Sequence, residues 1–205
     1  GGDSSGVQSE LSSGVVKVFN ARSAFAALKD DGSLVTWGHY ARGGDSSGVQ
    51  SDLLSGVVKV YSTERALAAL KNDGSVVTWG DSDYGGDSSG VQSDLSSGVV
   101  KIYSTERAFA ALKNDGSVVT WGWSSVGGDS SGVQSDLSSG VVAIYSTERA
   151  FAALKDDNTL VCWGYSDDGG TTPSDATDIK ELAHGKIYYN GHYSNNINYI
   201  NNSES

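Results

Sequence analysis

A near-identical internal repeat constrains this 205-residue chain more than any other feature. The phrase GGDSSG begins at Gly1, Gly43, Gly85 and Gly127, a spacing of 42 residues each time. A period of this length is typical of solenoids, propellers and other arrays, in which each unit buries its apolar face against the next. The chain therefore divides into four tandem repeats, 1–42, 43–84, 85–126 and 127–168.

The remaining residues, 169–205, open in phase and then diverge. Terminal repeats are expected to be atypical because they must cap or close an array. This segment is predicted to form a divergent fifth unit or a C-terminal cap, with strand-like pieces at 178–182, 186–190 and 196–200.

Each repeat contains three strand-like segments and a weaker fourth. In the second copy the three are Val57–Ser62, Ala66–Lys71 and 75–80, and the weaker candidate is 48–53. The runs VVKVYS and SVVTWG are rich in the β-branched and aromatic residues that strands favour. The eight residues ERALAALK also contain good helix formers. A helix that short is marginal by itself, so a strand is favoured there.

The second and third strands are predicted to form a hairpin. Their connection, Asn72-Asp73-Gly74, is a strong turn signal because glycine adopts positive φ without steric cost. In the fourth copy Asn158 replaces this glycine, and asparagine is the next most tolerant residue in the left-handed region. Alternation along the third strand places Val77 and Trp79 on one face of the sheet and their neighbours on the other.

A tryptophan recurs at the same position in every copy, as Trp37, Trp79, Trp121 and Trp163. Such a residue suits packing between units or a sugar-stacking platform. Packing is favoured, because a residue present in every unit serves what every unit needs. The single cysteine, Cys162, stands where the other copies have threonine, which predicts a buried, unreactive thiol and excludes an internal disulfide.

The string SGVVKIYSTERAFAALKNDGSVVTWG resembles the repeat of the regulator-of-chromosome-condensation (RCC1) type. It is most similar to the short-repeat branch that includes the bacterial β-lactamase inhibitory propeller. The resemblance covers residues 1–168 well and 169–182 loosely. It implies an all-β fold of RCC1-like β-propeller blades, in a family that is usually seven-bladed. Three arrangements stay open: a five-unit ring, part of a larger array, and an open β-repeat array completed by neighbouring chains.

Composition excludes several classes of partner. The formal net charge of −11 argues against nucleic acid, since phosphate binding needs clustered Lys and Arg. No apolar run approaches the roughly 20 residues of a membrane span, so membrane insertion is not expected. The chain has no methionine, begins inside a repeat and shows no signal peptide, which indicates a piece of a longer protein.

Catalytic and metal motifs are weak. The phrase GDSSG occurs once in every repeat and has no histidine in phase with it, so it is interpreted as a turn between units rather than a nucleophile motif. The acidic residues of the connecting loops match no calcium-binding pattern and are interpreted as solvated: Asp81, Asp83, Asp87, Asp167 and Asp168. His184 and His192 lack further ligands in the sequence. No catalytic residue, metal or cofactor is therefore predicted.

The copies differ most in the four residues that follow each Trp-Gly. A rigid scaffold with varied loops is the usual plan of a binding surface, although neutral drift would produce the same variation. The candidate binding residues in these rim loops are His39, Tyr40, Arg42, Asp81, Tyr84, Trp123, Tyr165 and Asp167. The aromatic members would supply the contact area that dominates binding hot spots.

Two functions follow from these features. The first is a non-enzymatic repeat scaffold that binds a protein or glycan through the variable loops, secreted or at a bacterial cell surface. The alternative is a structural protomer that joins copies of itself head to tail into a fibre or larger array.

Overall fold

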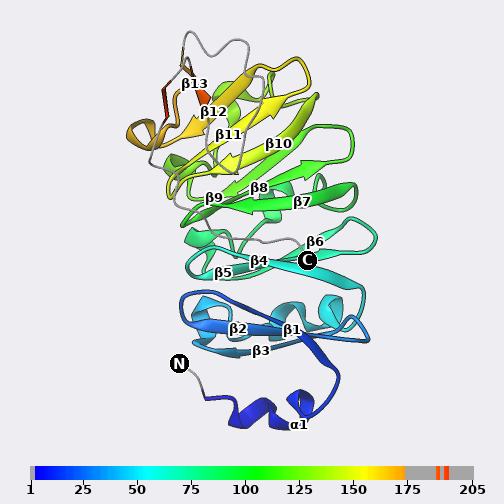
Figure 1. Cartoon of the computed structure of the whole chain (residues 1–205). Helices are drawn as coiled ribbons and strands as arrows, with labels where there is room; N and C mark the ends of the chain where they lie inside the picture. The colour runs from blue at the N-terminus through cyan, green and yellow to red at the C-terminus, as the bar shows by residue number, and fades with distance from the viewer. Residues whose placement is uncertain (1–2, 174–187, 190–191, 194–205) are drawn as a thin grey trace.

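The computed structural model describes residues 3–173, 188–189 and 192–193. Each of the four repeats forms one three-stranded antiparallel sheet, and the sheets stack one upon another with the first and fourth at opposite ends (Figure 1). The all-β prediction is confirmed. We refer to the four sheets, with the loops that follow them, as blades one to four.

The strands have matching lengths in every blade. Blade one contains β1 (Val15–Asn20), β2 (Ala24–Lys29) and β3 (Leu34–Gly38), and blade two contains β4 (Val57–Ser62), β5 (Ala66–Lys71) and β6 (Val76–Gly80). Blade three contains β7 (Val99–Ser104), β8 (Ala108–Lys113) and β9 (Val118–Gly122), and blade four contains β10 (Val141–Ser146), β11 (Ala150–Lys155) and β12 (Leu160–Gly164). Two short strands, β13 (Tyr188–Tyr189) and β14 (His192–Tyr193), pair with each other.

Helical turns are confined to the connections. A short α-helix, α1 (Gln8–Leu11), follows η1 (Ser5–Val7) at the N-terminal end. The other connections carry 3₁₀ turns: η2 (Tyr40–Arg42), η3 (Ser47–Leu53), η4 (Ser82–Tyr84), η5 (Ser89–Val91), η6 (Ser124–Val126), η7 (Ser131–Val133) and η8 (Ser166–Asp168).

The apolar core lies between successive blades. Val76 points to blade three, where it packs with Ile102 and Phe109, whereas Trp79 on the opposite face packs with residues of blade one. This confirms the alternation expected for the third strand. The indole Nε1 of Trp79 donates a 3.0 Å hydrogen bond to the carbonyl of Gly43, and Trp121 and Trp163 repeat this bond. The recurring tryptophan is thus a packing residue between blades, as predicted.

The segment expected to form a weak fourth strand, 48–53, is helical instead. It lies within η3, and the equivalent segments of blades three and four begin with the 3₁₀ turns η5 and η7. The Asp45 carboxylate accepts the Ser47 amide at 2.9 Å, and the Ser46 carbonyl accepts the Val49 amide at 3.0 Å. These local bonds offer the backbone an alternative to a sheet ladder. The prediction of a strand there was wrong, and each blade has three strands.

The predicted hairpins are present in all four blades. Ala66–Lys71 is a strand whose Leu70 pairs with Val76, which excludes the helix that its composition allowed. Asn158, at the fourth turn, has a φ of 64° and is the one non-glycine residue with positive φ among the described residues. The substitution therefore preserves the left-handed conformation, as expected.

Of the predicted tail strands, 178–182 and 196–200 lie outside the described residues, and β13 falls within 186–190.

Candidate binding rim

Two loops of every blade meet at the same end of its strands and so lie along one side of the stack. Because the sheets are antiparallel, the connection from the first to the second strand lies at the same end as the loop that follows the third strand. In blade two the amide of Asp81 donates a 3.0 Å hydrogen bond to the carbonyl of Arg65, and each other blade has the equivalent bond. We call this side of the stack the rim. It consists of residues 21–23, 63–65, 105–107 and 147–149, with the variable loops 39–42, 81–84, 123–126 and 165–168.

The four variable loops have the same backbone although their side chains are unrelated. The first residue of each is extended, with φ/ψ of −72/118°, −70/122°, −68/119° and −74/123° in chain order. The glycine that directly follows each loop is left-handed, with φ between 89° and 104°. The rim thus presents different side chains from one repeated, defined frame.

Threonines hold this frame in blades two to four, where blade one has Ala21. The Thr63 hydroxyl donates a 2.8 Å hydrogen bond to the carbonyl of Tyr84 and also accepts the amide of Ala66. Thr105 and Thr147 make the same pair of bonds in blades three and four. A loop whose backbone is tied in this way loses little further conformational freedom when its side chains meet a partner.

The structure brings the predicted binding residues to the rim but gives them unequal exposure. Tyr40, Trp123 and Tyr165 are 74%, 41% and 37% exposed, and His39 stacks on Tyr40 with ring centroids 5.4 Å apart. Asp167 is exposed, and Arg42 and Asp81 are half-buried. Tyr84 is only 5% exposed, so its ring packs inside the rim and offers little surface to a partner.

A row of arginines underlies the variable side chains. The Arg107 guanidinium lies 4.9 Å from the ring centre of Tyr84 and 5.9 Å from that of Trp123. Arg149 lies 4.4 Å from the ring centre of Tyr165 and donates from Nε to Asp168 at 2.6 Å. A guanidinium over an aromatic face contributes roughly 0.5–2 kcal/mol. The exposed rings of Trp123 and Tyr165 therefore each have an arginine packed against them.

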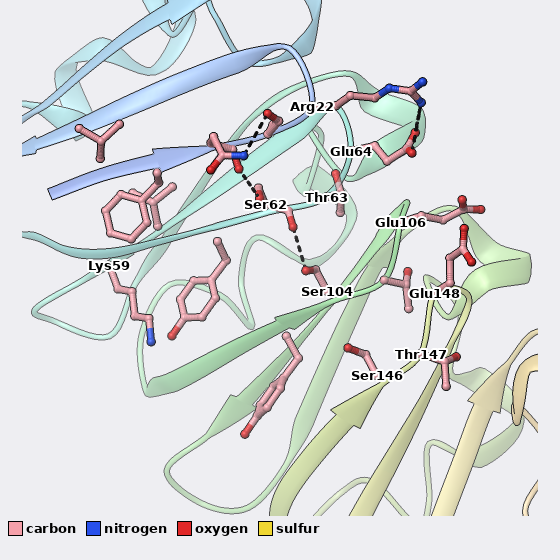
Figure 2. Close-up of a pocket in the computed structure, with 18 of the residues that line it drawn as sticks. Arg22, Lys59, Ser62, Thr63, Glu64, Ser104, Glu106, Ser146, Thr147 and Glu148 are labelled. Atoms are coloured by element: carbon pink, nitrogen blue, oxygen red, sulfur yellow. Dashed lines mark hydrogen bonds and ion pairs between the residues drawn. The ribbon is translucent and has the colours of Figure 1, made fainter. Parts of the chain in front are cut away.

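A row of carboxylates borders the arginines on the side of the first strands. The amides of Arg22, Glu64 and Glu106 each donate to the carbonyl 42 residues further on, at 3.0, 3.0 and 2.8 Å. This ladder places Glu64, Glu106 and Glu148 one after another on successive blades, with Arg22 paired to Glu64 at 3.3 Å (Figure 2).

The carboxylate row forms one edge of a groove of about 830 Å³. The groove is lined by the first strand of each blade and the loop after it (Figure 2). Its wall repeats the same chemistry from blade to blade, with the rings of Phe19, Tyr61 and Tyr103 and the hydroxyls of Ser62, Ser104 and Ser146. The groove and the variable loops thus share the rim.

The Glu and Arg rows were not predicted from the sequence. Their Thr-Glu-Arg triplet is constant in the second to fourth copies and carries no variation that would have marked it. A signal was nevertheless present, because in a three-stranded antiparallel sheet the first connection must lie beside the end of the third strand.

The described residues offer little for covalent chemistry. Cys162 is 6% exposed, and burial raises the pKa of its thiol to about 11, so the reactive thiolate is scarce near neutral pH, in agreement with the predicted inert thiol. Asp87 accepts the Ser89 amide at 2.9 Å and acts as a turn residue. Among the described residues, no helix is long and apolar enough to cross a membrane. His184 lies outside those residues.

Solved structures with a similar arrangement are propellers. Yeast RCC1 (Prp20) bound to Kap60 has a TM-score of 0.50 at 20% sequence identity, covering 73% of this chain and 43% of that one. Prp20p from Saccharomyces cerevisiae, described with its binding to Gsp1p and histones, has a TM-score of 0.49 at 18% identity, covering 89% and 52%. The CRINKLY WD40 ectodomain of the Arabidopsis thaliana receptor kinase ACR4 has a TM-score of 0.46 at 17% identity, covering 74% and 51%.

The chain spans about half or less of the length of these RCC1 structures. No protein-family model matches it, and no curated protein is similar to it. The likeness to yeast RCC1 shows the fold, so the repeats are blades of the RCC1 propeller type. Membership of the short-repeat branch stays a prediction.

Proposed function

We propose that this chain is a non-enzymatic repeat scaffold whose rim binds a protein partner. The observation that carries the proposal is the repeated loop frame, in which four loops with matching backbone dihedral angles at both ends present unrelated side chains. Evolutionary drift alone changes loop side chains, but here the threonines of blades two to four keep the backbone of their changing loops defined. A rigid frame with varied side chains is the arrangement that recognition surfaces use.

The chemistry of the rim favours a protein over a glycan. Exposed aromatic rings that are held on arginines resemble the anchors of protein interfaces, which are rich in Tyr, Trp and Arg. Yeast RCC1, which has the same fold, has been solved with the protein Kap60 bound to it. The matched part of this chain is a fraction of that protein, so the likeness supports the class of partner and not its identity.

The charge of the rim favours a partner surface with basic residues. Arg65 and Arg149 are paired with loop aspartates at 3.8 and 2.6 Å, whereas Glu148 and Asp167 form no ion pair with another described residue. The whole chain carries a formal charge of −11, which steers positively charged surfaces toward it. A secreted or cell-surface setting, and the absence of catalysis, belong to this proposal as well.

The test uses peptides, since no partner is identified. A displayed random-peptide library is selected on the wild-type chain, and the selected peptides are titrated against the Trp123→Ala/Tyr165→Ala double variant. We expect enrichment of peptides with Lys or Arg beside apolar residues, and a loss of affinity of tenfold or more, because each buried aromatic anchor contributes roughly 2 kcal/mol.

The matched control is Val100→Ala. Val100 is 52% exposed on a first strand and lies outside the rim, so this variant should bind the peptides as the wild type does. Peptides that bind the double variant as tightly as the wild type would refute the rim as the binding surface. A glycan array is probed with the wild type, the double variant and Val100→Ala to test the other class of partner. Glycan binding that the double variant loses would show that the rim binds a glycan rather than a protein.

A further inference from the structure

Tyr84 is covered by two arginines that belong to successive blades. The guanidinium carbons of Arg65, in blade two, and Arg107, in blade three, lie 4.5 and 4.9 Å from the centre of the Tyr84 ring. A ring has two faces, and two positive groups at these distances repel each other least on opposite ones. The 5% exposure of Tyr84 agrees with a ring that is covered on both sides. The rim thus contains an arginine–tyrosine–arginine sandwich.

These two arginines depend on the aromatic ring more than on hydrogen bonds. The Nε atoms of Arg65 and Arg107 are buried, and neither makes a hydrogen bond within the described part of the chain. Their carboxylate partners lie at longer range, with Arg65 Nη1 3.8 Å from Asp81 and Arg107 Nε 3.5 Å from Glu106. A guanidinium is attracted to the negative face of an aromatic ring, and more strongly where water is excluded. Stacking of arginine on an aromatic face is therefore already a packing element of the rim.

Trp123 continues this stack but is covered by one arginine only. Arg107, which packs on Tyr84, also lies 5.9 Å from the ring centre of Trp123. Among the described residues no second cation lies over Trp123, which is 41% exposed. The groups follow one another as Arg65, Tyr84, Arg107 and Trp123. The face that a second arginine covers at Tyr84 is therefore open to solvent at Trp123.

Carboxylates lie next to the end of the stack. The amide of Trp123 donates a 3.0 Å hydrogen bond to the carbonyl of Arg107, and the amide of the preceding Glu106 donates at 2.8 Å to the carbonyl of Glu148. Glu148 is exposed and forms no ion pair with another described residue. A cation that approached Trp123 would be repelled by Arg107, and these carboxylates offset that repulsion. The surroundings of Trp123 therefore favour a positively charged group.

We infer that Trp123 binds an arginine side chain of the protein partner, which stacks on the open face of the indole as the two arginines stack on Tyr84. The inference rests on the function proposed for the rim and names the group that the partner contributes. Arginine fits better than lysine, because its planar guanidinium stacks on rings and is more weakly hydrated. Among the described residues, every cation that packs on a ring at the rim is an arginine, whereas the lysine–aromatic pairs lie on the first strands.

The first test is an NMR titration of the nitrogen-15-labelled full chain with the tripeptide acetyl-Gly-Arg-Gly-amide. The Trp123→Phe variant identifies the indole N–H signal of Trp123. This signal should shift, while the signals of Trp79, Trp121 and Trp163, whose indoles donate hydrogen bonds inside the stack, should stay in place. The matched probe replaces arginine by citrulline, which has nearly the same shape and no charge, and should shift the signal much less. An equal shift with citrulline, or no shift with arginine, would overturn the inference.

The second test is a thermodynamic cycle with the peptides selected on the wild-type chain. Replacing the peptide arginine by citrulline should weaken binding to the wild type and to Val100→Ala roughly 2- to 30-fold, and should change binding to Trp123→Leu little, because leucine has no aromatic face. Selected peptides without arginine, or equal losses on the wild type and Trp123→Leu, would overturn the inference. Failure to select any peptide would instead count against the protein-binding rim, and the tripeptide titration would still decide whether Trp123 binds arginine.

Discussion

At the scale of single residues, the glycine of the hairpin turn meets two separate requirements. Gly74 has a φ of 78°, which other residues adopt only with strain. A Cβ atom at this position would also lie 2.7 Å from the backbone nitrogen of Gly98 in the next blade. Gly32 and Gly116 have equally close neighbours, at 2.9 and 2.8 Å. The left-handed turn alone accepts asparagine, as Asn158 shows, whereas the contact between blades does not.

Gly74→Asn should therefore be costly although the same residue occurs naturally at 158. We expect a loss of about 2 kcal/mol in the free energy of unfolding, because the added Cβ forces two backbones apart. Asn158→Gly should change it by less than about 1 kcal/mol, since only the preference for positive φ is altered. Urea denaturation of the two variants measures both values, and equal effects would contradict the second requirement.

At the scale of elements, the first strand of each blade belongs to two structures at once. In blades two to four it pairs with the second strand of its own sheet and packs on the sheet of the preceding blade, whereas in blade one it only pairs within its sheet. The lysine that ends the second strand ties in the connection as well, since Lys71 Nζ donates to the carbonyl of Asp52 at 2.7 Å and the other blades repeat the bond. The first strand therefore contributes differently to the free energy of unfolding in blade one than in the other blades.

Val60→Ala and Val18→Ala remove the same atoms from equivalent strands. Val60 is 3% exposed, so its truncation should lower the free energy of unfolding by about 2 kcal/mol through lost burial and a cavity. Val18 is 52% exposed, and its truncation should cost less than about 0.5 kcal/mol at concentrations where the chain is monomeric. Thermal or urea unfolding distinguishes these values, and matching losses would show that the face of blade one is covered in solution.

At the scale of the whole molecule, stability is distributed by position in the stack. Each blade contacts its immediate neighbours, so the free energy of unfolding is close to a sum of blade and interface contributions. Among the described residues, blade one shares one apolar interface, with blade two, whereas blades two and three have apolar interfaces on both sides. The amides of blade one should therefore open more readily than those of the two middle blades.

Native-state hydrogen exchange at low protein concentration measures this order directly. We expect faster exchange in β1, β2 and β3 than in the equivalent strands of blades two and three. The near-identical sequences serve as the control, because intrinsic exchange rates are nearly the same at equivalent positions. Uniform protection across the three blades would indicate a single cooperative unit instead.

The sequence alone was sufficient for the features that depend on local chemistry or on what every repeat needs. The 42-residue period, three of the strands, the Asp-Gly hairpins and the packing role of Trp79 could all be inferred, because alternation and turn residues act over a few positions. The sequence-based prediction failed at 48–53, where hydrogen bonds accepted by the Asp45 carboxylate and the Ser46 carbonyl outweigh a weak strand propensity.

The tertiary structure decided which residues share a surface. Arg107 lies beside Trp123 because antiparallel pairing returns the chain to the same end of the blade, and Glu64 and Glu106 are aligned because the blades stack. It also decided that Val60 is buried while Val18, at the equivalent position of blade one, is exposed. Exposure depends on what packs against a residue, and in a stack of nearly identical blades that depends on position in the stack rather than on the local sequence.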